Sequence, residues 1–279
     1  MILKINSSKF NLDSEFKESY NSICDIGKEY AREKTVCITG LARNVESVIN
    51  SNLNILDSLK ENFKKQYLVV YENDSTDDTP NIIRKWMSNR SDCYLISENL
   101  GSEHPRGPSS KSKIRTEAMS RYRNSSKSYI KDNLQDIDYI IVVDLDFQGL
   151  SIAGIINSFG WIKKDNIDIM AGHSYLPYKI NEDKTLETSN YDSWAFRQNW
   201  WEDRQHLMSW FLFWHPTVGS PPMRVNSAFG GMCIYNSSMY LNTDYEGYDC
   251  EHVCFHKNIY LKYPNCNLFV NPSQFMITS

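Results

Sequence analysis

Apolar runs alternate with amphipathic segments along the first half of the chain. The run at 139–143 is continuous and rich in β-branched residues, which predicts a strand covered on both faces. With it, four short apolar runs predict strands. They are residues 35–42, 66–71, 93–96 and 139–143. The segments between them place apolar residues at helical spacing or begin with helix-favouring residues such as proline. The predicted helices are 46–63, 80–88 and 111–133. Strands that alternate with helices in this way predict an α/β fold with a parallel sheet flanked by helices.

The second half of the chain is less regular. A helix is expected at 152–162, a strand at 168–172 and a strand at 225–235 that two glycines interrupt. A final helix follows residue 249, and a closing strand and tail follow residue 259. We therefore expect a helical extension over residues 1–33 and one domain over 34–279. Within that domain, residues 34–150 and 151–279 form two halves.

Length and composition exclude several classes of protein. The chain has 279 residues and a formal net charge of −4, which gives no electrostatic footprint for nucleic acid. No segment approaches the roughly 20 apolar residues of a membrane span, and the start is too short for a signal peptide. The seven cysteines form no C-x-x-C pair, so reduced thiols are expected. One N-x-S/T sequon lies in the most functional-looking loop, which favours a compartment without N-glycosylation, such as the cytoplasm, with peripheral membrane contact left open.

The run at 139–143 ends in Asp144-Leu145-Asp146. Alternation along an extended backbone places both carboxylates on one side, with the leucine turned inward. Ligands of open α/β sheets bind at the carboxyl ends of the strands. Carboxylate oxygens suit Mn²⁺ or Mg²⁺ that also holds phosphate oxygens. Asp146, helped by Asp144, is thus a candidate metal ligand, although a lone D-x-D also occurs in ordinary polar turns.

The octet from Glu72 to Thr79 follows the strand at 66–71 and is almost entirely polar. Part of it can cap the following helix. The remainder is more than a cap requires, and we expect Glu72 and Asp74, with Arg43 after the first strand, to bind a nucleoside. In the basic helix at 111–133, most charges are expected to face solvent, and Arg115 is the candidate for a diphosphate or donor sugar.

Val70-Tyr-Glu-Asn-Asp-Ser-Thr-Asp-Asp-Thr79 together with Asp144-Leu145-Asp146 resembles the nucleotide-sugar half of GT-A glycosyltransferases. More narrowly, it resembles the fungal capsular α-1,3-mannosyltransferase family and the chlorovirus glycosyltransferases that build capsid glycans. The resemblance covers about residues 35–260. It implies a GT-A, Rossmann-like and mostly parallel sheet with a small antiparallel C-terminal region on the acceptor side. It also implies a UDP- or GDP-sugar donor and a glycan or glycoprotein acceptor.

Two features of the second half point to a sugar site. Residues 173–225 are rich in tryptophan, and an aromatic stretch of this kind serves either as core or as a surface that stacks on sugar rings. Asp192 and Arg197 are its polar members worth testing. Gly230 and Gly231 allow a close backbone approach, either to a ligand or within a sheet corner. The resembled families carry a similar Ser-Ala-Phe-Gly-Gly segment beside the donor sugar.

The segment 248–256 contains Asp249, a plausible N-cap that would place Glu251, His252 and His256 on the following helix. The GT-A resemblance implies that an acidic residue here faces the acceptor, which points to Glu251 and then Asp249. It also implies that a late histidine completes the metal site, and we expect His256 rather than His252. A core or capping role for either histidine remains an alternative.

These observations predict a metal-dependent glycosyltransferase, and the resemblance favours retention of configuration. Leu145, Gly230 and Gly231 are expected to line the donor site together with Asp144. A nucleotidyltransferase or phosphotransferase also needs paired carboxylates and a nucleotide site, although the chain lacks a G-x-x-x-x-G-K-[ST] loop. A carbohydrate-binding protein without catalysis is the third alternative.

Overall fold

The computed structural model describes the chain as two compact units, each assembled from separate stretches of sequence. Unit 1 contains residues 1–31, 147–232 and 267–279, and unit 2 contains residues 32–146 and 233–266. The described residues are 4–5, 10–101, 112–180, 185–200 and 214–278.

Unit 2 is built on parallel strands in the spatial order β5, β2, β3 and β4, with β10 beside β5. The pairings of β2 with β3, β2 with β5 and β3 with β4 are all parallel. Their bounds are β2 Thr35–Ala42, β3 Lys65–Asn73, β4 Cys93–Glu98, β5 Tyr139–Val143 and β10 Met232–Asn236. The continuous apolar runs correctly predicted the first strand, β2, and the D-x-D strand, β5. Every residue of β5 is buried, as is typical of a strand covered on both faces.

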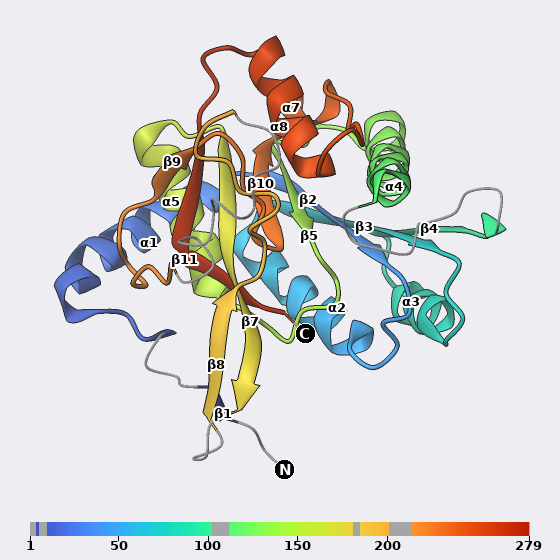
Figure 1. Ribbon diagram of the computed structural model, residues 1–279, viewed down its shortest axis with the longest axis horizontal. Helices are drawn as coiled ribbons and strands as arrows, with labels where there is room; N and C mark the ends of the chain where they lie inside the picture. The colour runs from blue at the N-terminus through green and yellow to red at the C-terminus, as the bar shows by residue number, and fades with distance from the viewer. Residues whose placement is uncertain (1–3, 6–9, 102–111, 181–184, 201–213, 279) are drawn as a thin grey trace. The chain divides into compact units, whose positions relative to one another are not determined.

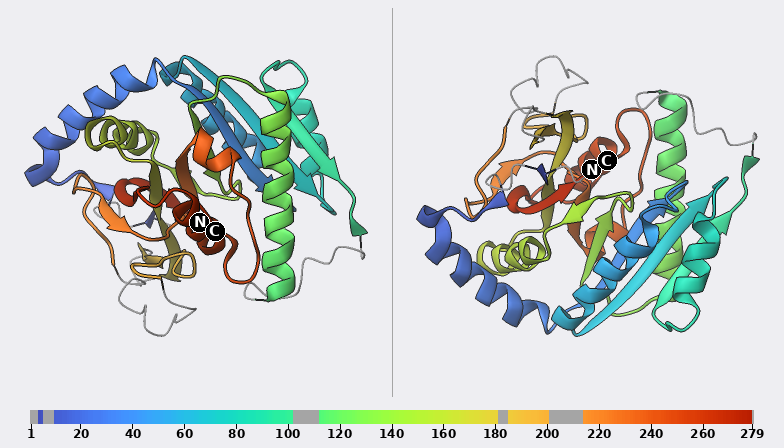
Figure 2. Two further views of the ribbon diagram at one scale, coloured as in Figure 1. Left: turned by 90° about the horizontal axis from the view of Figure 1, so that it is seen from above. Right: turned by 90° about the horizontal axis from the view of Figure 1, so that it is seen from below.

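Helices cover both faces of this sheet (Figures 1 and 2). Those on one face are α2 Ile49–Ser58, with the 3-10 turn Leu59–Asn62 after it, and α3 Thr79–Met87. Those on the other are α4 Lys113–Asn133, α7 Ser237–Leu241 and α8 Glu251–Lys262. The helix predicted at 46–63 starts later, because Asn44, Val45 and Glu46 bond to the loop after β3 instead. The final helix runs past residue 259, where a strand had been expected.

Unit 1 combines helices with strands of mixed direction. Its helical elements are the 3-10 turn Ser14–Phe16, α1 Lys17–Ala31 and α5 Ile152–Asp165. Its strands are β1 Lys4–Ile5, β6 Gly149–Leu150, β7 Ile169–Ile180, β8 Thr185–Asn190, β9 Met223–Val225 and β11 Leu268–Ile277. β11 is parallel to β7 but antiparallel to β6 and β9, and β7 is antiparallel to β8. The expected antiparallel region is therefore present.

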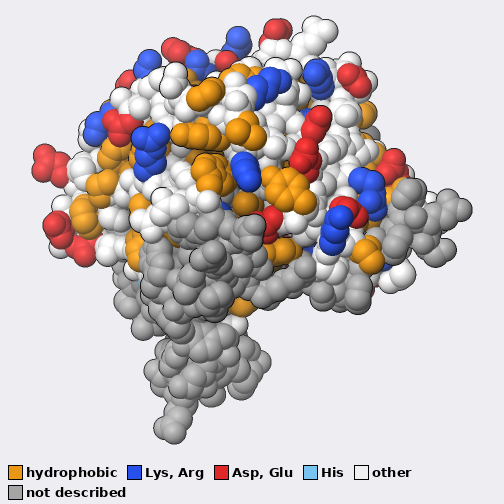
Figure 3. All heavy atoms as spheres, turned by 45° about the horizontal axis from the view of Figure 1, so that its top comes forward, with side chains coloured by type: hydrophobic (Ala, Val, Ile, Leu, Met, Phe, Trp, Pro, Cys, Tyr) orange, Lys and Arg blue, Asp and Glu red, His pale blue; other side chains and the backbone are white. Residues whose placement is uncertain are grey.

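Surface charge and cysteines add little that is specific. On the face shown in Figure 3, acidic and basic side chains are interspersed. All seven cysteines are free thiols, and all but Cys93 are buried. Within the described residues, no helix combines the length and hydropathy required to cross a membrane.

Candidate nucleotide-sugar site

The loop after β3 is fastened to the loop after β2 by reciprocal hydrogen bonds. Asn44 accepts from the Thr76 amide at 2.8 Å, and its own amide donates to the Ser75 hydroxyl at 3.1 Å. The Val45 amide donates to the Thr79 hydroxyl at 2.8 Å. Asn44 has a φ of 53°, a left-handed conformation that asparagine tolerates better than most residues. Much of the polar octet therefore holds the loop in shape, which explains part of its composition without a ligand.

Acidic residues reinforce the same joint. Asp77 accepts from the amides of Glu46 and Thr79 at 3.1 Å, and Glu46 accepts from the Asp78 amide at 2.8 Å. Although partial burial opposes the effect, these hydrogen bonds hold the pKa of Asp77 below its usual value. Asp77 therefore remains ionised at neutral pH and accepts hydrogen bonds that hold the two loops together.

Glu72 is 2% exposed and lies at the base of this loop. One carboxylate oxygen accepts from the Ser75 amide at 3.0 Å, and the other accepts from the Ser97 hydroxyl at 2.6 Å. Arg84 of α3 donates to the same Ser97 hydroxyl at 3.1 Å. Glu72 thus links the end of β3 to the end of β4.

Asp74 also holds backbone in place. With a φ of 50°, it turns its carboxylate to accept from the amides of Leu100 and Gly101 at 2.8 and 2.9 Å. Partial burial would raise its pKa, but these bonds, the Asn73 amide and the charge of Arg43 together lower it. Asp74 is therefore a fixed anion at the mouth of the loop.

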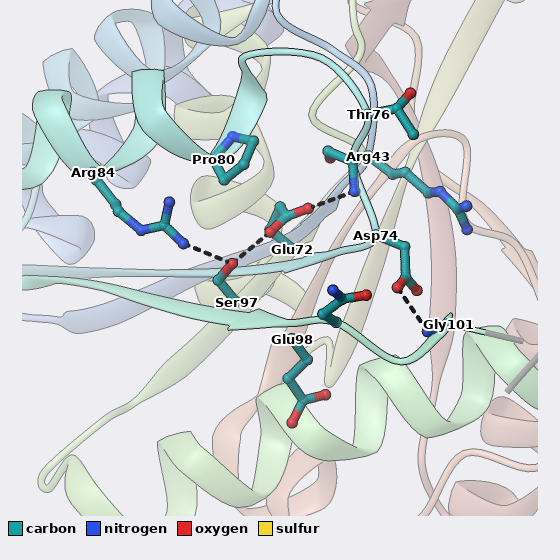
Figure 4. A pocket seen from close by; sticks show the side chains of 11 residues that line it. Arg43, Glu72, Asp74, Thr76, Pro80, Arg84, Ser97, Glu98 and Gly101 are labelled. Carbon is teal, nitrogen blue, oxygen red and sulfur yellow. Dashed lines mark hydrogen bonds between the residues drawn. The ribbon is translucent and has the colours of Figure 1, made fainter. Parts of the chain in front are cut away.

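These residues line an open pocket of about 720 Å³ at the carboxyl ends of β3 and β4 (Figure 4). The lining residues are Arg43, Glu72, Asp74, Ser75, Thr76, Pro80, Arg84, Ser97, Glu98, Asn99 and Gly101. Polar donors and acceptors therefore surround the pocket, and two guanidinium groups belong to its wall. The structure brings together the three residues predicted to bind a nucleoside, Arg43, Glu72 and Asp74.

The D-x-D turn lies at the same edge of the sheet, because β5 runs parallel to β2. Leu145 is 1% exposed, whereas Asp144 is partly exposed and Asp146 exposed. Buried Asn52 of α2 donates to the Leu145 carbonyl at 2.9 Å. Gly40 of β2 also has to be small, since a Cβ there would lie 2.4 Å from the Val143 carbonyl oxygen. The buried leucine and these two neighbours fix the turn that carries both carboxylates.

Helix α4 carries a buried polar stripe that the sequence reading missed. Thr116, Ser120, Arg123 and Lys127 repeat at helical spacing and are all buried. Most charges of this helix were expected to face solvent, but Arg123 is an exception, since it is 4% exposed. Its Nε donates to Glu251 at 3.2 Å, and its Nη2 lies 3.7 Å from Asp144. Threonine and serine in phase with two basic residues were the available signal.

Arg115 stands at the start of the same helix and is partly exposed. Its backbone amide donates to the side chain of the N-cap Ser112 at 3.2 Å. It does not belong to the pocket wall described above. Its contact with a diphosphate or donor sugar remains a prediction.

At the start of α8 the structure corrects the expected cap. Cys250 is the N-cap residue, and Asp249 accepts from the Cys250 amide at 2.7 Å without capping the helix. Glu251 is 7% exposed and pairs with Arg123, while Asp249 is partly exposed. Of the two candidate catalytic carboxylates in this segment, Asp249 is the more accessible to a substrate.

Both histidines of α8 are buried. The Nε2 atom of His256 lies in a hydrogen bond with the Tyr235 hydroxyl at 2.9 Å. Burial lowers the pKa of His256 to about 3, and burial, with the charge of Arg123, lowers that of His252 well below its usual value. Both rings are neutral in the folded protein. Metal binding through Nε2 of His256 would require the bond to Tyr235 to be given up, and a metal role for His256 remains a prediction.

Asp144 and Asp146 fit a cation that arrives with a phosphate-bearing substrate. Across the described residues, no three His, Cys, Asp or Glu side chains group into a complete metal site. Mg²⁺ is, however, usually held by one or two carboxylates together with substrate phosphates. Asp144, partly exposed, and Asp146, exposed, match that donor set.

The candidates in unit 1 are held by their own unit. Asp192 accepts from the amides of Gly230 and Ala195 at 3.1 and 3.4 Å. Gly230 and Gly231 have φ of 61° and 74°, and a Cβ on Gly230 would lie 2.2 Å from the Gly172 carbonyl oxygen. These glycines therefore meet a packing need and also separate β9 from β10, where one interrupted strand had been expected.

The aromatic stretch is described only in part. Arg197 is 1% exposed and donates to the carbonyls of Trp194 and Phe196 at 2.7 and 2.9 Å, so it belongs to the core. Residues 201–213, which hold part of the tryptophan-rich segment, lie outside the described residues. The same is true of residues 102–111, most of the loop expected before α4.

Comparisons with known proteins point to one fold. No protein-family model matches the sequence. Procollagen galactosyltransferase 1-A of Xenopus laevis is 27% identical over 176 residues, which is 61% of this chain and 25% of that protein. The chain thus spans about a quarter of that relative's length.

Solved structures resemble the chain over most of its length. Residues 1–349 of S. aureus TarS match with a TM-score of 0.50 at 14% identity, over 88% of this chain and 60% of that one. The mannosyltransferase PcManGT from Pyrobaculum calidifontis, in complex with GDP-Man and Mn²⁺, matches at 0.51 and 11%, over 94% and 66%. Glucosyl-3-phosphoglycerate synthase from Mycobacterium tuberculosis, in complex with Mn²⁺, UDP and phosphoglyceric acid, matches at 0.51 and 14%, over 89% and 72%. At these identities the likeness establishes the fold, and the chain has the GT-A glycosyltransferase fold.

Proposed function

We propose that the protein is a metal-dependent glycosyltransferase that moves a sugar from a UDP- or GDP-sugar to a glycan or glycoprotein acceptor. The observation that carries the proposal is the edge of the unit 2 sheet. A polar pocket after β3 and β4 and the two carboxylates after β5 lie at the carboxyl ends of parallel strands of one sheet, with β2 between β5 and β3. That edge is where open α/β sheets bind nucleotides.

In this proposal the pocket holds the nucleoside. The carboxylates of Glu72 and Asp74 suit the hydroxyl and N–H donors of ribose and base. The guanidinium of Arg43 suits a base face or a phosphate, because it is planar and always charged. The resembled capsular and viral enzymes and the galactosyltransferase relative make mannose and galactose donors the first to test.

Asp144 and Asp146 would hold Mn²⁺ or Mg²⁺ against the diphosphate. When bound, such a cation supplies positive charge that stabilises the departing nucleoside diphosphate. Arg115 would add a charge-assisted hydrogen bond to the diphosphate or the donor sugar. The buried Leu145 anchors the turn that carries the two carboxylates.

The candidate catalytic carboxylates are Asp249, Glu251 and Asp192. Partial exposure supports Asp249 for the contact with the reacting sugar, since Glu251 is buried against Arg123. We favour a retaining reaction, in which such a carboxylate stabilises an oxocarbenium-like transition state. Proton NMR of the newly formed anomeric centre would distinguish retention from inversion.

Thermal unfolding against a panel of nucleotides tests the donor site. A ligand that binds only the native state raises the apparent stability. UDP or GDP, or one of their sugars, should raise the midpoint with Mn²⁺ present and raise it less in EDTA. No change with any member of the panel would contradict the proposal. A response to nucleoside triphosphates with release of pyrophosphate would instead indicate a nucleotidyltransferase.

A further inference from the structure

Arg123 is a buried cation of unit 2 that lies close to two carboxylates, those of Glu251 and Asp144. Arg123 is 4% exposed, and its Nε donates to Glu251 Oε1 at 3.2 Å. Its Nη2 lies 3.7 Å from Asp144 Oδ1, beyond the range of a good hydrogen bond. The group thus holds one positive and two negative charges, and the guanidinium is nearer to the glutamate.

The two carboxylates differ in their surroundings. The side chain of Glu251 is 9% exposed, whereas that of Asp144 is 24% exposed. A buried cation requires a nearby anion, and the hydrogen-bonded, buried glutamate meets that requirement. Asp144 is the more exposed of the two carboxylates and belongs to the same turn as the exposed Asp146.

This inference rests on the proposed function. We propose that Glu251 is a positioning residue that balances the charge of Arg123, so that Arg123 does not draw the Asp144 carboxylate away from the divalent cation. Without Glu251, the guanidinium would turn its full charge on Asp144 and compete with the cation for it. Glu251 therefore supports metal binding without touching the metal, and the carboxylate that meets the substrate is Asp249.

Removing Glu251 and Arg123 together separates a positioning role for Glu251 from direct contact with the metal. Direct contact predicts weak Mn²⁺ binding in both the single and the double variant, whereas a positioning role predicts recovery in the double variant. Glu251→Gln should weaken Mn²⁺ binding about tenfold, because a cation beside Asp144 loses its partner. The double variant Arg123→Met/Glu251→Met should restore Mn²⁺ affinity to within about threefold of the parent protein. Buried ion pairs replaced by apolar residues of similar volume often leave stability unchanged or higher, so the double variant should fold.

Lys127 provides the matched control one turn further along α4. It is also 4% exposed and pairs with Asp244. Asp244 is 82% exposed in its side chain and is distinct from the D-x-D turn. Lys127→Met removes a buried cation from the same helix and should leave Mn²⁺ affinity unchanged, whatever it does to stability.

The measurement is the affinity for Mn²⁺ in the presence of UDP or GDP, from the electron paramagnetic resonance signal of the free ion. Nucleotide affinity in EDTA should be the same in the parent and in Glu251→Gln, since only the cation is affected. Equal Mn²⁺ affinity in Glu251→Gln and the parent would overturn the inference. So would a double variant as weak as Glu251→Gln, because Glu251 would then act directly.

If Glu251→Gln does not fold, the double variant alone decides. Affinity near the parent value supports the inference, since the Glu251 carboxylate is gone, and a loss of tenfold or more contradicts it. A parent protein that binds no Mn²⁺ with either nucleotide would refute the proposed function and this inference together. That outcome differs from the others, because it appears before any variant is compared.

Discussion

The buried carboxylate of Glu72 allows a quantitative test of how the pocket after β3 and β4 is stabilised. Its two oxygens accept from the Ser75 amide at 3.0 Å and the Ser97 hydroxyl at 2.6 Å. Glu72→Gln keeps the size of the side chain but removes the charge and turns one acceptor into a donor. The Gln oxygen can still accept from the Ser75 amide, while its NH₂ group faces a hydroxyl that already accepts from Arg84.

The expected cost follows from the change in bond type. Hydrogen bonds to charged groups contribute roughly 1.5–3 kcal/mol and neutral ones roughly 0.5–1.5 kcal/mol. Two bonds weakened in this way amount to about 2 kcal/mol in the free energy of unfolding. For a chain of this size that corresponds to roughly 3–4 °C in the thermal midpoint. Glu72→Ala, which leaves two donors without their acceptor, should cost about 3 kcal/mol or more.

Urea unfolding followed by far-UV circular dichroism provides the assay, with equal m-values as the check on the unfolded state. The matched control is Glu46→Gln, an exposed glutamate that accepts a single amide from Asp78 at 2.8 Å. It should change stability by less than about 0.5 kcal/mol. If Glu72→Gln were no more destabilising than Glu46→Gln, the described hydrogen-bonding role of Glu72 would be wrong.

Three further predictions address the D-x-D turn and acid stability. Asn52→Ala leaves the buried Leu145 carbonyl without its donor and should lower the free energy of unfolding, measured with urea, by about 1–3 kcal/mol. The same variant should weaken Mn²⁺ binding. An unchanged Mn²⁺ affinity would show that the turn does not support the metal site. Gly40→Ala should lower both stability and nucleotide affinity, since its Cβ would lie 2.4 Å from the Val143 carbonyl oxygen, and wild-type behaviour in both assays would refute that contact. Burial, with His215 nearby, lowers the pKa of His173 to about 3, against about 6.5 in the unfolded chain. The unfolded state therefore takes up the proton first, so stability should be complete above pH 6.5 and decline as the pH falls toward 3. His173→Gln should reduce that decline by up to about 1.4 kcal/mol per pH unit, and an identical decline in both proteins would contradict the assignment.

The parallel part of the fold could be read from sequence because its signals are local. The apolar run 139–143 and the run 35–42 are buried on both faces, so hydrophobicity alone marks them. The separate units could not be read in this way, since unit 1 joins α1, residues 147–232 and β11 through long-range contacts. The start of α2 was missed for a related reason, because Asn44 and Glu46 bond across to the neighbouring loop.

The candidate site could likewise be predicted from sequence only where its signals are local. Arg43, Glu72 and Asp74 could be placed together because they follow adjacent parallel strands. Arg123 could not, because the charge of a helical arginine says nothing about its exposure until its partners Glu251 and Asp144 are known. For the same reason, the sequence could not show that His256 bonds to Tyr235 or that Gly230 packs against Gly172.

Consumption of nucleotide sugars by the purified protein is the most direct test of the proposed glycosyltransferase activity. UDP- and GDP-linked sugars would be incubated with Mn²⁺, with water serving as acceptor, and the nucleotide products separated by chromatography. At least one donor should release its sugar and an equal amount of nucleoside diphosphate. EDTA or Asp146→Ala should abolish that release. Release that neither EDTA nor Asp146→Ala reduces, or no release from any donor, would contradict the proposed metal-dependent activity.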